Sequence, residues 1–337
     1  MRSEWKVGIV HFFFFMFFGA GLVFGEIYKI PSATEPLPPL FEDLGSTAVG
    51  LPAYPPPDIK PLNLISGISP ARKSPSVVSS TRKQLLEAIE TGDLELAKRL
   101  LIGFDINTQD NRGVTLLYKS VFHKRFDFVR LLLEQGADAN LPDYEGLTPL
   151  HVTALENLDS LVSVLLDHGA KLEAKDDYGY TPLHLATDQG NTKAAHALIK
   201  RGANVNNRSE WGNTPLHASI FQGNMNLVKL LLKRGGDIHA TDRLGRSALH
   251  WAAEKGHLSI SKFLIINGAR IQQQDYEGHT PLHDASRWDK KKIVKLLIFH
   301  GANVNAKGSD GRGPLHIAIA NGNMEIANLL KGHGAKL

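Results

Sequence analysis

The sequence contains no cysteine among its 337 residues. Disulfide bonds, thiolate zinc sites and a cysteine nucleophile are therefore excluded. A strong charge of one sign is also missing, because 38 lysine and arginine residues stand against 34 aspartate and glutamate residues. Residues 1–75 hold six residues of each sign, so the net charge of +4 lies further along the chain. A dispersed excess of this size is not typical of nucleic-acid-binding proteins, whose basic residues cluster.

Motifs of catalysis and phosphate binding are missing as well. The sequence has no Gly-x-Ser-x-Gly nucleophile elbow, no Walker phosphate loop and no His-Glu-x-x-His metal motif. We therefore predict that the protein is not an enzyme and that it uses no cofactor and no metal ion.

One long apolar run occurs, at residues 7–25. Its length is about that of a helix that spans a bilayer. It exceeds the usual core of a signal peptide and no Ala-x-Ala follows it, so residues 1–30 are interpreted as an uncleaved signal anchor of a single-pass membrane protein. The alternative is a signal peptide cleaved before Glu26, which would give a secreted or periplasmic protein. The flanking charges favour an N-terminus in the cytoplasm and the rest of the chain on the far side.

Proline is concentrated in the next segment. Eleven of the seventeen prolines fall within residues 31–79. Proline without apolar periodicity cannot build a core and favours an extended spacer. We therefore predict a disordered, proline-rich linker over residues 31–79.

The rest of the chain repeats a short phrase, Gly-x-Thr-Pro-Leu-His, in strict or looser form. Its leading glycines are 33 residues apart, and they are Gly113, Gly146, Gly179, Gly212, Gly245, Gly278 and Gly311. A fixed period of this size indicates a stack of repeats. Glycine suits a tight hairpin turn, threonine caps the following helix, and proline is tolerated at its first position. A Gly-Ala pair later in most repeats predicts the end of a second helix.

This pattern resembles the ankyrin repeat. The resemblance rests on Asp-x-x-Gly-x-Thr-Pro-Leu-His, paired leucines, Gly-Ala and Asn-Val-Asn, and it covers about residues 80–337. It implies an all-α repeat solenoid with short β-hairpins that binds other proteins. It also favours a cytosolic location for the repeats, against the charges that flank the apolar run. The expected repeats are 80–109, 110–142, 143–175, 176–208, 209–241, 242–274, 275–307 and 308–337.

Some repeats depart from the pattern. The first lacks the hairpin phrase, and Ser80 or Thr81 is expected to cap its first helix, with Gln84 completing a capping box. Gly313 replaces the cap threonine of the last repeat, which predicts a weaker helix start. At the turn between the two helices, Lys124, Asn157 and Asp289 replace glycine. Asparagine and aspartate tolerate a left-handed backbone better than most residues, whereas lysine is less suited to it.

A row of histidines could suggest a metal site. Successive rings should lie roughly 10 Å apart, about the distance between two packed layers, whereas a zinc ion binds each nitrogen ligand at about 2.1 Å. The row therefore cannot share one metal ion. The resemblance implies instead that each histidine hydrogen-bonds the adjacent loop. The expected structural caps are Thr148, Thr181, Thr214, Thr280, His151, His184, His217, His250, His283 and His316.

The resemblance places partner binding on the hairpin tips and on the ends of the first helices. The candidate surface consists of Tyr144, Glu145, Tyr178, Tyr180, Trp211, Phe221, Gln222, Arg243, Arg246, Tyr276, His279, Arg287 and Trp288. Tyrosine, tryptophan and arginine dominate binding hot spots. We therefore expect a membrane-tethered adaptor that binds a protein partner. The alternative is a secreted or periplasmic protein with a structural role, or one that binds an anionic partner through Lys290, Lys291 and Lys292.

Overall fold

The computed structural model describes residues 75–337, with side chains from residue 79. Over this range the chain is helical, with sixteen helices in eight consecutive pairs. The first pair is α2 (Pro75–Thr91) and α3 (Leu94–Leu101). The predicted all-α repeat stack is confirmed.

Each later pair has a first helix of seven or eight residues, here called inner, and a second of nine residues, here called outer. The inner helices are α4 (Leu116–Phe122), α6 (Pro149–Leu155), α8 (Pro182–Asp188), α10 (Pro215–Phe221), α12 (Ala248–Lys255), α14 (Pro281–Arg287) and α16 (Pro314–Ala320). The outer helices are α5 (Phe126–Glu134), α7 (Asp159–Asp167), α9 (Thr192–Lys200), α11 (Met225–Lys233), α13 (Leu258–Ile266), α15 (Lys291–Phe299) and α17 (Met324–Gly332).

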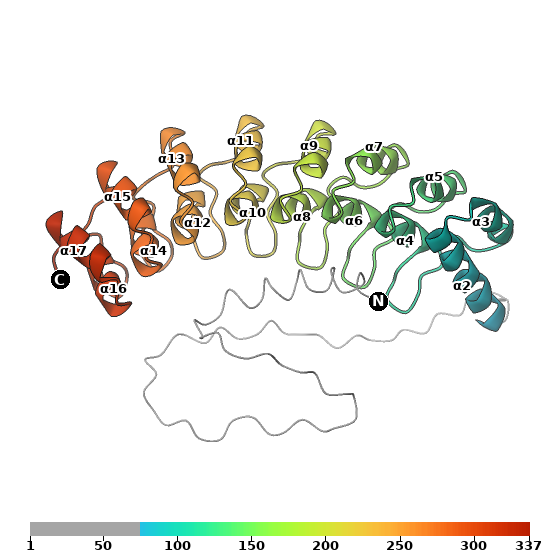
Figure 1. Cartoon of the computed structure of the whole chain (residues 1–337), viewed down its shortest axis with the longest axis horizontal. Helices are drawn as coiled ribbons and strands as arrows, with labels where there is room; N and C mark the ends of the chain where they lie inside the picture. Colours follow the sequence, from blue (N-terminus) through green and yellow to red (C-terminus); the bar gives the residue numbers. More distant parts are fainter. Residues whose placement is uncertain (1–74) are drawn as a thin grey trace, which may run out of the picture. The chain divides into compact units, whose positions relative to one another are not determined.

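The helices of residues 75–337 form two layers. Each inner helix contacts the inner helix of the next repeat and its own outer helix, and neighbouring outer helices contact one another. Figure 1 shows the outer helices along the upper edge of a curved stack and the connecting loops projecting from the lower edge.

The core lies between the layers and repeats with the sequence. The leucine that follows the helix-start proline is almost fully buried in each strict repeat, as at Leu150 and Leu183. A leucine of the outer helix, such as Leu165 or Leu198, is buried at the matching position of each repeat. Burying one such side chain contributes roughly 2 kcal/mol. Because these side chains pack against the neighbouring repeats, the interfaces between repeats stabilise the stack.

The predicted helix ends are also confirmed. After α7, Gly169 has φ of 84°, and the N–H of Ala170 donates to the carbonyl of Leu165 at 3.0 Å. This is a Schellman-type helix end, which requires the left-handed backbone that glycine adopts easily. At the turn between helices, Lys124, Asn157 and Asp289 have φ of 58°, 57° and 54°, so all three adopt the left-handed backbone of the glycines they replace.

Two predictions of local structure need correction. Helix α2 begins at Pro75, so Ser80 and Thr81 lie inside the helix and do not cap it. Proline is itself a favoured first residue of a helix, which allows the earlier start. The predicted β-hairpins are tight turns, and the described residues hold only one isolated β-bridge, between Thr241 and Ser247.

The predicted signal anchor at residues 7–25 and almost all of the predicted linker lie outside the described residues. Among the helices within residues 75–337, none combines the length and the apolar character needed to cross a membrane.

Candidate protein-binding surface

A threonine and a histidine fix the start of a typical inner helix. At α8, the N–H of Thr181 donates to Nδ1 of His184 at 3.2 Å, and Thr181 Oγ1 lies 2.9 Å from the same nitrogen. Since Nδ1 accepts, the proton of the neutral ring lies on Nε2. That nitrogen is 3.1 Å from the carbonyl oxygen of Asn213 in the next repeat. The histidine therefore ties its own helix to the neighbouring loop.

The same arrangement recurs in full at His151 and His250, whereas at His217 and His283 the Nδ1 contact recurs and Nε2 forms no hydrogen bond to the described residues. Nε2 of His151 lies 3.0 Å from the carbonyl oxygen of Tyr180, and Nε2 of His250 lies 3.0 Å from that of His279. Burial lowers the pKa of His184 and His250 to about 4, which keeps the rings neutral near pH 7. A neutral ring is needed because Nδ1 must accept the N–H of the cap residue.

The last repeat lacks the hydroxyl contact at its helix start. Gly313 donates its N–H to Nδ1 of His316 at 3.3 Å, but it has no hydroxyl that could contact the same nitrogen. His316 is only half-buried, whereas His184 and its counterparts in repeats three to seven are buried. Within residues 75–337, no three His, Asp or Glu side chains gather in a way that could hold a metal ion.

The hairpin loops are joined to one another by backbone hydrogen bonds. The N–H of Glu210 donates to the carbonyl of Tyr178 at 2.8 Å, and the N–H of Arg243 donates to that of Trp211 at 2.9 Å. The N–H of Tyr276 continues the series to the carbonyl of Leu244 at 2.9 Å. The loop tips thus form a ladder with one bond between successive repeats, which holds their side chains at a fixed spacing.

Glycine is required where the loops meet. Gly179 has φ of 74°, and a Cβ at this position would lie 2.9 Å from the backbone nitrogen of Glu210. The close approach that allows the inter-loop hydrogen bond is therefore possible only without a side chain at this position.

Apolar side chains line the outside of this ladder. Tyr178, Trp211 and Leu244 occupy one loop position in three successive repeats, with Trp211 44% and Leu244 45% exposed. Tyr144 and Tyr276 flank them and are 71% and 78% exposed. We call these five residues the loop surface. Glu145 is also exposed here, and Arg243 is exposed with its guanidinium 3.2 Å from the carboxylate of Glu210.

Two predicted surface residues are buried instead. Tyr180 is 8% exposed and His279 is 6% exposed. Both follow the hairpin glycine, and their N–H and C=O groups pair with the aspartate that begins the loop, Asp176 or Asp275. This pairing belongs to the inside of the turn, so Tyr180 and His279 lie in the stack, whereas the residues before each glycine, such as Tyr178 and Tyr276, reach solvent.

Arg246 is largely buried for a related reason. Its Nε lies 3.0 Å from Asp242 Oδ2, its Nη1 lies 3.0 Å from Glu254 Oε2, and its guanidinium stacks 4.9 Å above the Trp251 ring. The indole N–H of Trp251 donates to Asp242 Oδ2 at 3.0 Å. Arg246 thus acts as an internal brace between a loop and an inner helix.

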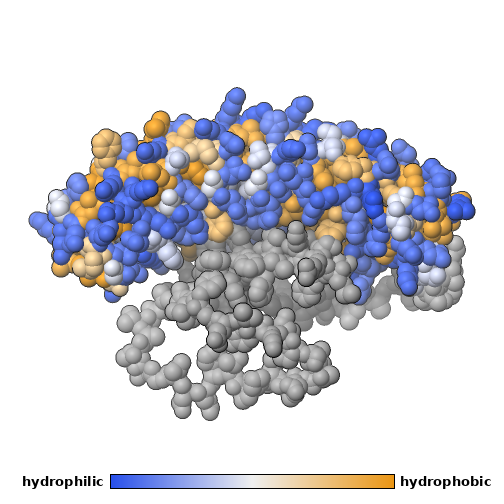
Figure 2. Space-filling model, viewed as in Figure 1, coloured by the Kyte–Doolittle hydropathy of each residue, from blue (hydrophilic) through white to orange (hydrophobic). Residues whose placement is uncertain are grey.

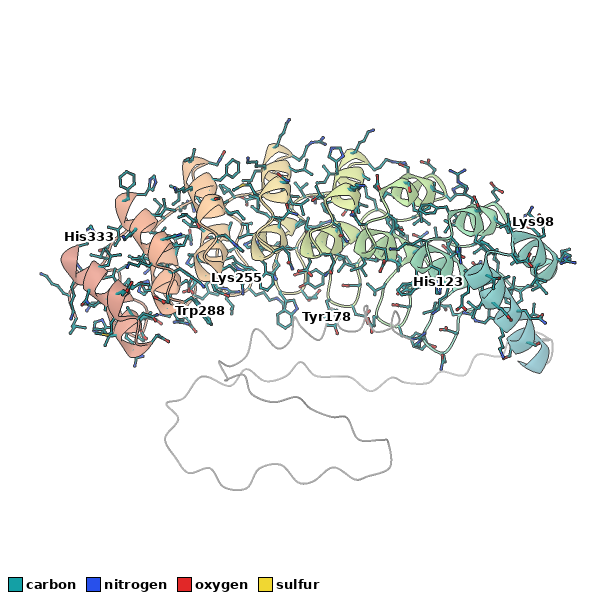
Figure 3. The ribbon with its side chains drawn as sticks, in the orientation of Figure 1. Lys98, His123, Tyr178, Lys255, Trp288 and His333 are labelled. Carbon is teal, nitrogen blue, oxygen red and sulfur yellow. The ribbon has the colours of Figure 1, made fainter. Side chains whose placement is uncertain are left out.

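The ends of the inner helices give a mixed result. Phe221 is half-buried, with its ring 5.9 Å from that of Trp251 and with Lys255 Nζ 4.2 Å above it. Gln222 is exposed, Arg287 is half-buried and Trp288 is 50% exposed. In Figure 3, Tyr178, Lys255 and Trp288 lie toward the loop edge of the stack, away from the outer helices.

Sequence reasoning missed one unusual inner residue, Asp284. It is 7% exposed, and its Oδ2 has no hydrogen-bond partner among the described residues. Burial, with a contribution from Glu254, raises its pKa well above the usual value. The sequence already shows that Asp284 is unusual. In repeats three to six and eight the same position is apolar, at Val152, Leu185, Ala218, Trp251 and Ile317, and in repeat two it is Lys119.

Comparison with known proteins supports the architecture. A family model described as ankyrin repeats matches overlapping stretches at residues 85–176, 142–209, 172–242, 201–275, 222–308 and 268–337. Among solved structures, the ankyrin repeat domain of Bcl-3, a member of the IkappaB protein family, is 30% identical with a TM-score of 0.58. That match covers 66% of this chain and 100% of the Bcl-3 chain. Curated protein sequences gave no match.

Proposed function

Because the chain belongs to the ankyrin repeat family, we propose that its repeats act as a non-enzymatic adaptor that binds a partner protein through the loop surface. Ankyrin repeats are protein-interaction domains, and their fold is typically a scaffold without catalytic activity. The observation that supports this site is the hydrogen-bonded loop ladder, which presents Tyr178, Trp211 and Leu244 side by side in successive repeats. A surface fixed before binding loses little conformational entropy when a partner docks.

The loop surface also suggests the form of the partner. Three successive repeats span roughly 20 Å at about 10 Å per layer. In the same loops, a charged residue directly precedes each of Tyr178, Trp211 and Leu244. These charged residues are Asp177, Glu210 and Arg243. A partner segment with a central apolar stretch and charged flanks matches this arrangement, because the apolar centre is desolvated while the charged rim sets orientation.

The binding site can be tested by crosslinking in cells. A photo-crosslinking amino acid at Trp211 should capture a defined partner, whereas the same probe at Asp167, on an outer helix, should not. With that partner purified, Trp211→Ala and Tyr178→Ala should each weaken binding by about tenfold or more, as expected for aromatic hot spots. Phe299→Ala, on an outer helix, is the matched control and should leave affinity unchanged. Unchanged affinity in the Tyr178, Trp211 and Trp288 triple alanine variant would refute the assignment.

We also propose that residues 7–25 tether the adaptor to a membrane, because the run has the length of a bilayer-spanning helix. The test is protease protection of a C-terminally tagged full chain in sealed vesicles that expose their cytoplasmic side. A protected tag places the repeats in the lumen or periplasm. A digested tag on a membrane-bound product places them in the cytosol. A product that stays soluble after alkaline extraction would contradict the tether.

A further inference from the structure

The outer helices of repeats four to eight carry a large excess of positive charge. Helices α9, α11, α13, α15 and α17 contain one acidic residue, Glu325, and nine lysines, all exposed. The lysines are Lys193, Lys200, Lys229, Lys233, Lys262, Lys291, Lys292, Lys295 and Lys331. The modest net charge of the whole chain conceals this local excess.

The outer helices of repeats two and three differ in charge. Helices α5 and α7 carry four acidic residues, Asp127, Glu134, Asp159 and Asp167, and one basic residue, Arg130. The basic face therefore begins at α9 and does not extend over the whole stack.

Two large apolar side chains interrupt this basic face. The last residue of each outer helix changes along the stack, in the order Glu134, Asp167, Lys200, Lys233, Ile266, Phe299 and Gly332. Ile266 is 79% exposed and Phe299 is 83% exposed. Each lies one helical turn after an exposed lysine, Lys262 or Lys295, on the same side of its helix. Figure 2 shows apolar side chains gathered over the outer ends of α13 and α15.

We propose that this outer face, centred on α13 and α15, docks on the surface of an anionic lipid bilayer. Lysine side chains reach anionic headgroups while neighbouring apolar side chains enter the boundary with the acyl chains, as in interfacial membrane binding. Ile266 and Phe299 would supply the inserted groups, and Lys262, Lys295 and the other lysines would supply the electrostatic attraction.

The composition of the face favours a bilayer over a nucleic acid. Helices α13 and α15, on which the face is centred, contain no arginine, although Arg201 and Arg234 follow the last residues of α9 and α11. Arginine is the residue that most often recognises phosphate and guanine by paired hydrogen bonds. An exposed isoleucine cannot stack on a base, which is how single strands are held. An isoleucine beside a phenylalanine does suit hydrocarbon.

The docking goes beyond the proposed adaptor function and uses a different surface. It leaves the loop surface open to a protein partner. It also implies that the repeats lie on the side of the anionic leaflet, which in cells is the cytoplasmic one. That location agrees with the habit of the family and opposes the charges that flank residues 7–25.

The absence of cysteine makes a direct test possible, since one introduced cysteine is the only labelling site. The full chain is labelled with an environment-sensitive fluorophore at Ile266→Cys or Phe299→Cys. It is then mixed with vesicles of phosphatidylcholine alone, or with about one third phosphatidylserine. We expect the emission to shift to shorter wavelength with phosphatidylserine only, and to return as salt shortens the Debye length. The matched positions Asp167→Cys, on α7, and Tyr144→Cys, in a loop, should stay aqueous.

Three results would overturn the docking proposal. One is no shift at either apolar position on phosphatidylserine vesicles. Another is an equal shift at all four labelled positions, which would mean unspecific adsorption. The third is a shift produced by RNA without vesicles, which would assign the face to a nucleic acid. Flotation with phosphatidylcholine vesicles reports the tether alone, so failure of the tether and failure of the docking are distinguished.

The lysines can be tested in the same assay. Lys262→Gln and Lys295→Gln should each reduce binding to the anionic surface roughly fivefold, measured as the phosphatidylserine content that gives half of the emission shift. Arg130→Gln, at the same helix position in repeat two, should leave it unchanged. Equal effects of Lys262→Gln and Arg130→Gln would contradict a docking face confined to the later repeats.

Discussion

The inner and outer layers are built from one 33-residue repeat, yet the inner helices keep the same residues at their starts while the outer helices change the residues at their ends. Five of the seven inner helices begin with the same pair, a threonine or serine followed three residues later by a histidine. The outer helices end on a different residue in almost every repeat, from Glu134 through Lys200 to Phe299.

The difference follows from what each position contacts. His184 links two repeats through its Nδ1 and Nε2 atoms, so few other side chains could replace it. Phe299 is largely exposed to solvent, so the fold does not require a particular residue at this position. Variation in the outer layer can therefore serve binding, whereas variation in the inner layer changes stability.

The largest predicted effect is a loss of stability of the inner layer in acid. Burial lowers the pKa of His184, His217, His250 and His283 to about 4, whereas an unfolded histidine titrates near 6.5. Between these values the unfolded chain binds more protons, so the stability that depends on neutral histidine is complete above pH 6.5 and is lost as the pH falls toward 4. Each of these pKa shifts corresponds to a loss of stability on the order of 3 kcal/mol once the histidine is protonated in the unfolded chain. Urea unfolding followed by circular dichroism from pH 7 to pH 4 should show a steep loss.

A variant provides the control for this titration. His184→Gln keeps a polar side chain that does not titrate, so it should lower stability at pH 7 and reduce the slope between pH 6.5 and 4. A slope unchanged in this variant would mean that His184 does not contribute to the acid sensitivity.

The brace around Asp242 is the next most sensitive point of the inner layer. Its carboxylate accepts the backbone N–H groups of Leu244 and Arg246, the Arg246 side chain and the Trp251 indole. Asp242→Ala would leave a largely buried guanidinium without this partner, which should cost about 3 kcal/mol. Ser209→Ala, at the same position of the preceding repeat, should cost about 1 kcal/mol or less. Similar losses in chemical denaturation of both variants would contradict a special role for Asp242.

Asp284 should behave in the opposite sense, because it is a polar residue in an apolar register. Burial raises its folded pKa, so its contribution to stability falls as the pH rises from the unfolded value, about 3.9, toward the folded one. Asp284→Ala should therefore stabilise the stack by about 1–2 kcal/mol at pH 7, and by less at pH 4. Thermal unfolding at the two pH values checks this, and Asp284→Asn should recover the pH-dependent part. A loss of stability at pH 7 would mean that Asp284 has a partner that compensates its burial.

Local geometry was predictable because few adjacent residues determine it. The left-handed turns at Lys124, Asn157 and Asp289 follow from the repeat register alone. The helix ends at the Gly-Ala pairs do so as well. The predicted start of the first helix was wrong because the first repeat lacks the Gly-x-Thr-Pro-Leu-His phrase that fixes the register in the other repeats.

The direction of side chains at the site was less predictable. Whether Tyr180 or His279 reaches solvent depends on hydrogen bonds to a residue four positions earlier and to a histidine of the preceding repeat. Two residues that flank the same glycine thus face opposite environments, which composition does not reveal. The outer patch at Ile266 and Phe299 was missed because single apolar residues at helix ends are common. It becomes visible only when the same position is compared across repeats.

Restoring the missing cap should make the last repeat resemble the others. Gly313→Thr would add the hydroxyl that Thr181 uses at α8, with a gain of a few tenths of a kcal/mol over glycine and about 1 kcal/mol over alanine. A Cβ at this position would lie 3.1 Å from the carbonyl oxygen of Ala306, so a small local shift is needed. Gly313→Ala introduces the same Cβ without the hydroxyl, and the difference between the two variants in thermal unfolding isolates the cap. Equal stability of both variants would show that the hydroxyl forms no cap at α16.

The smallest effect on stability is expected in the outer layer. Ile266→Lys and Phe299→Lys replace side chains that are 79% and 83% exposed, so each should change the free energy of unfolding by less than about 0.5 kcal/mol. Leu264→Lys, two residues away and fully buried, should be strongly destabilising, because it places a charge in the core. A loss above about 1 kcal/mol for Ile266→Lys would mean that this side chain packs in the fold. The outer row would then be constrained like the inner one, and the contrast between the two layers would fail at the residues on which membrane docking depends.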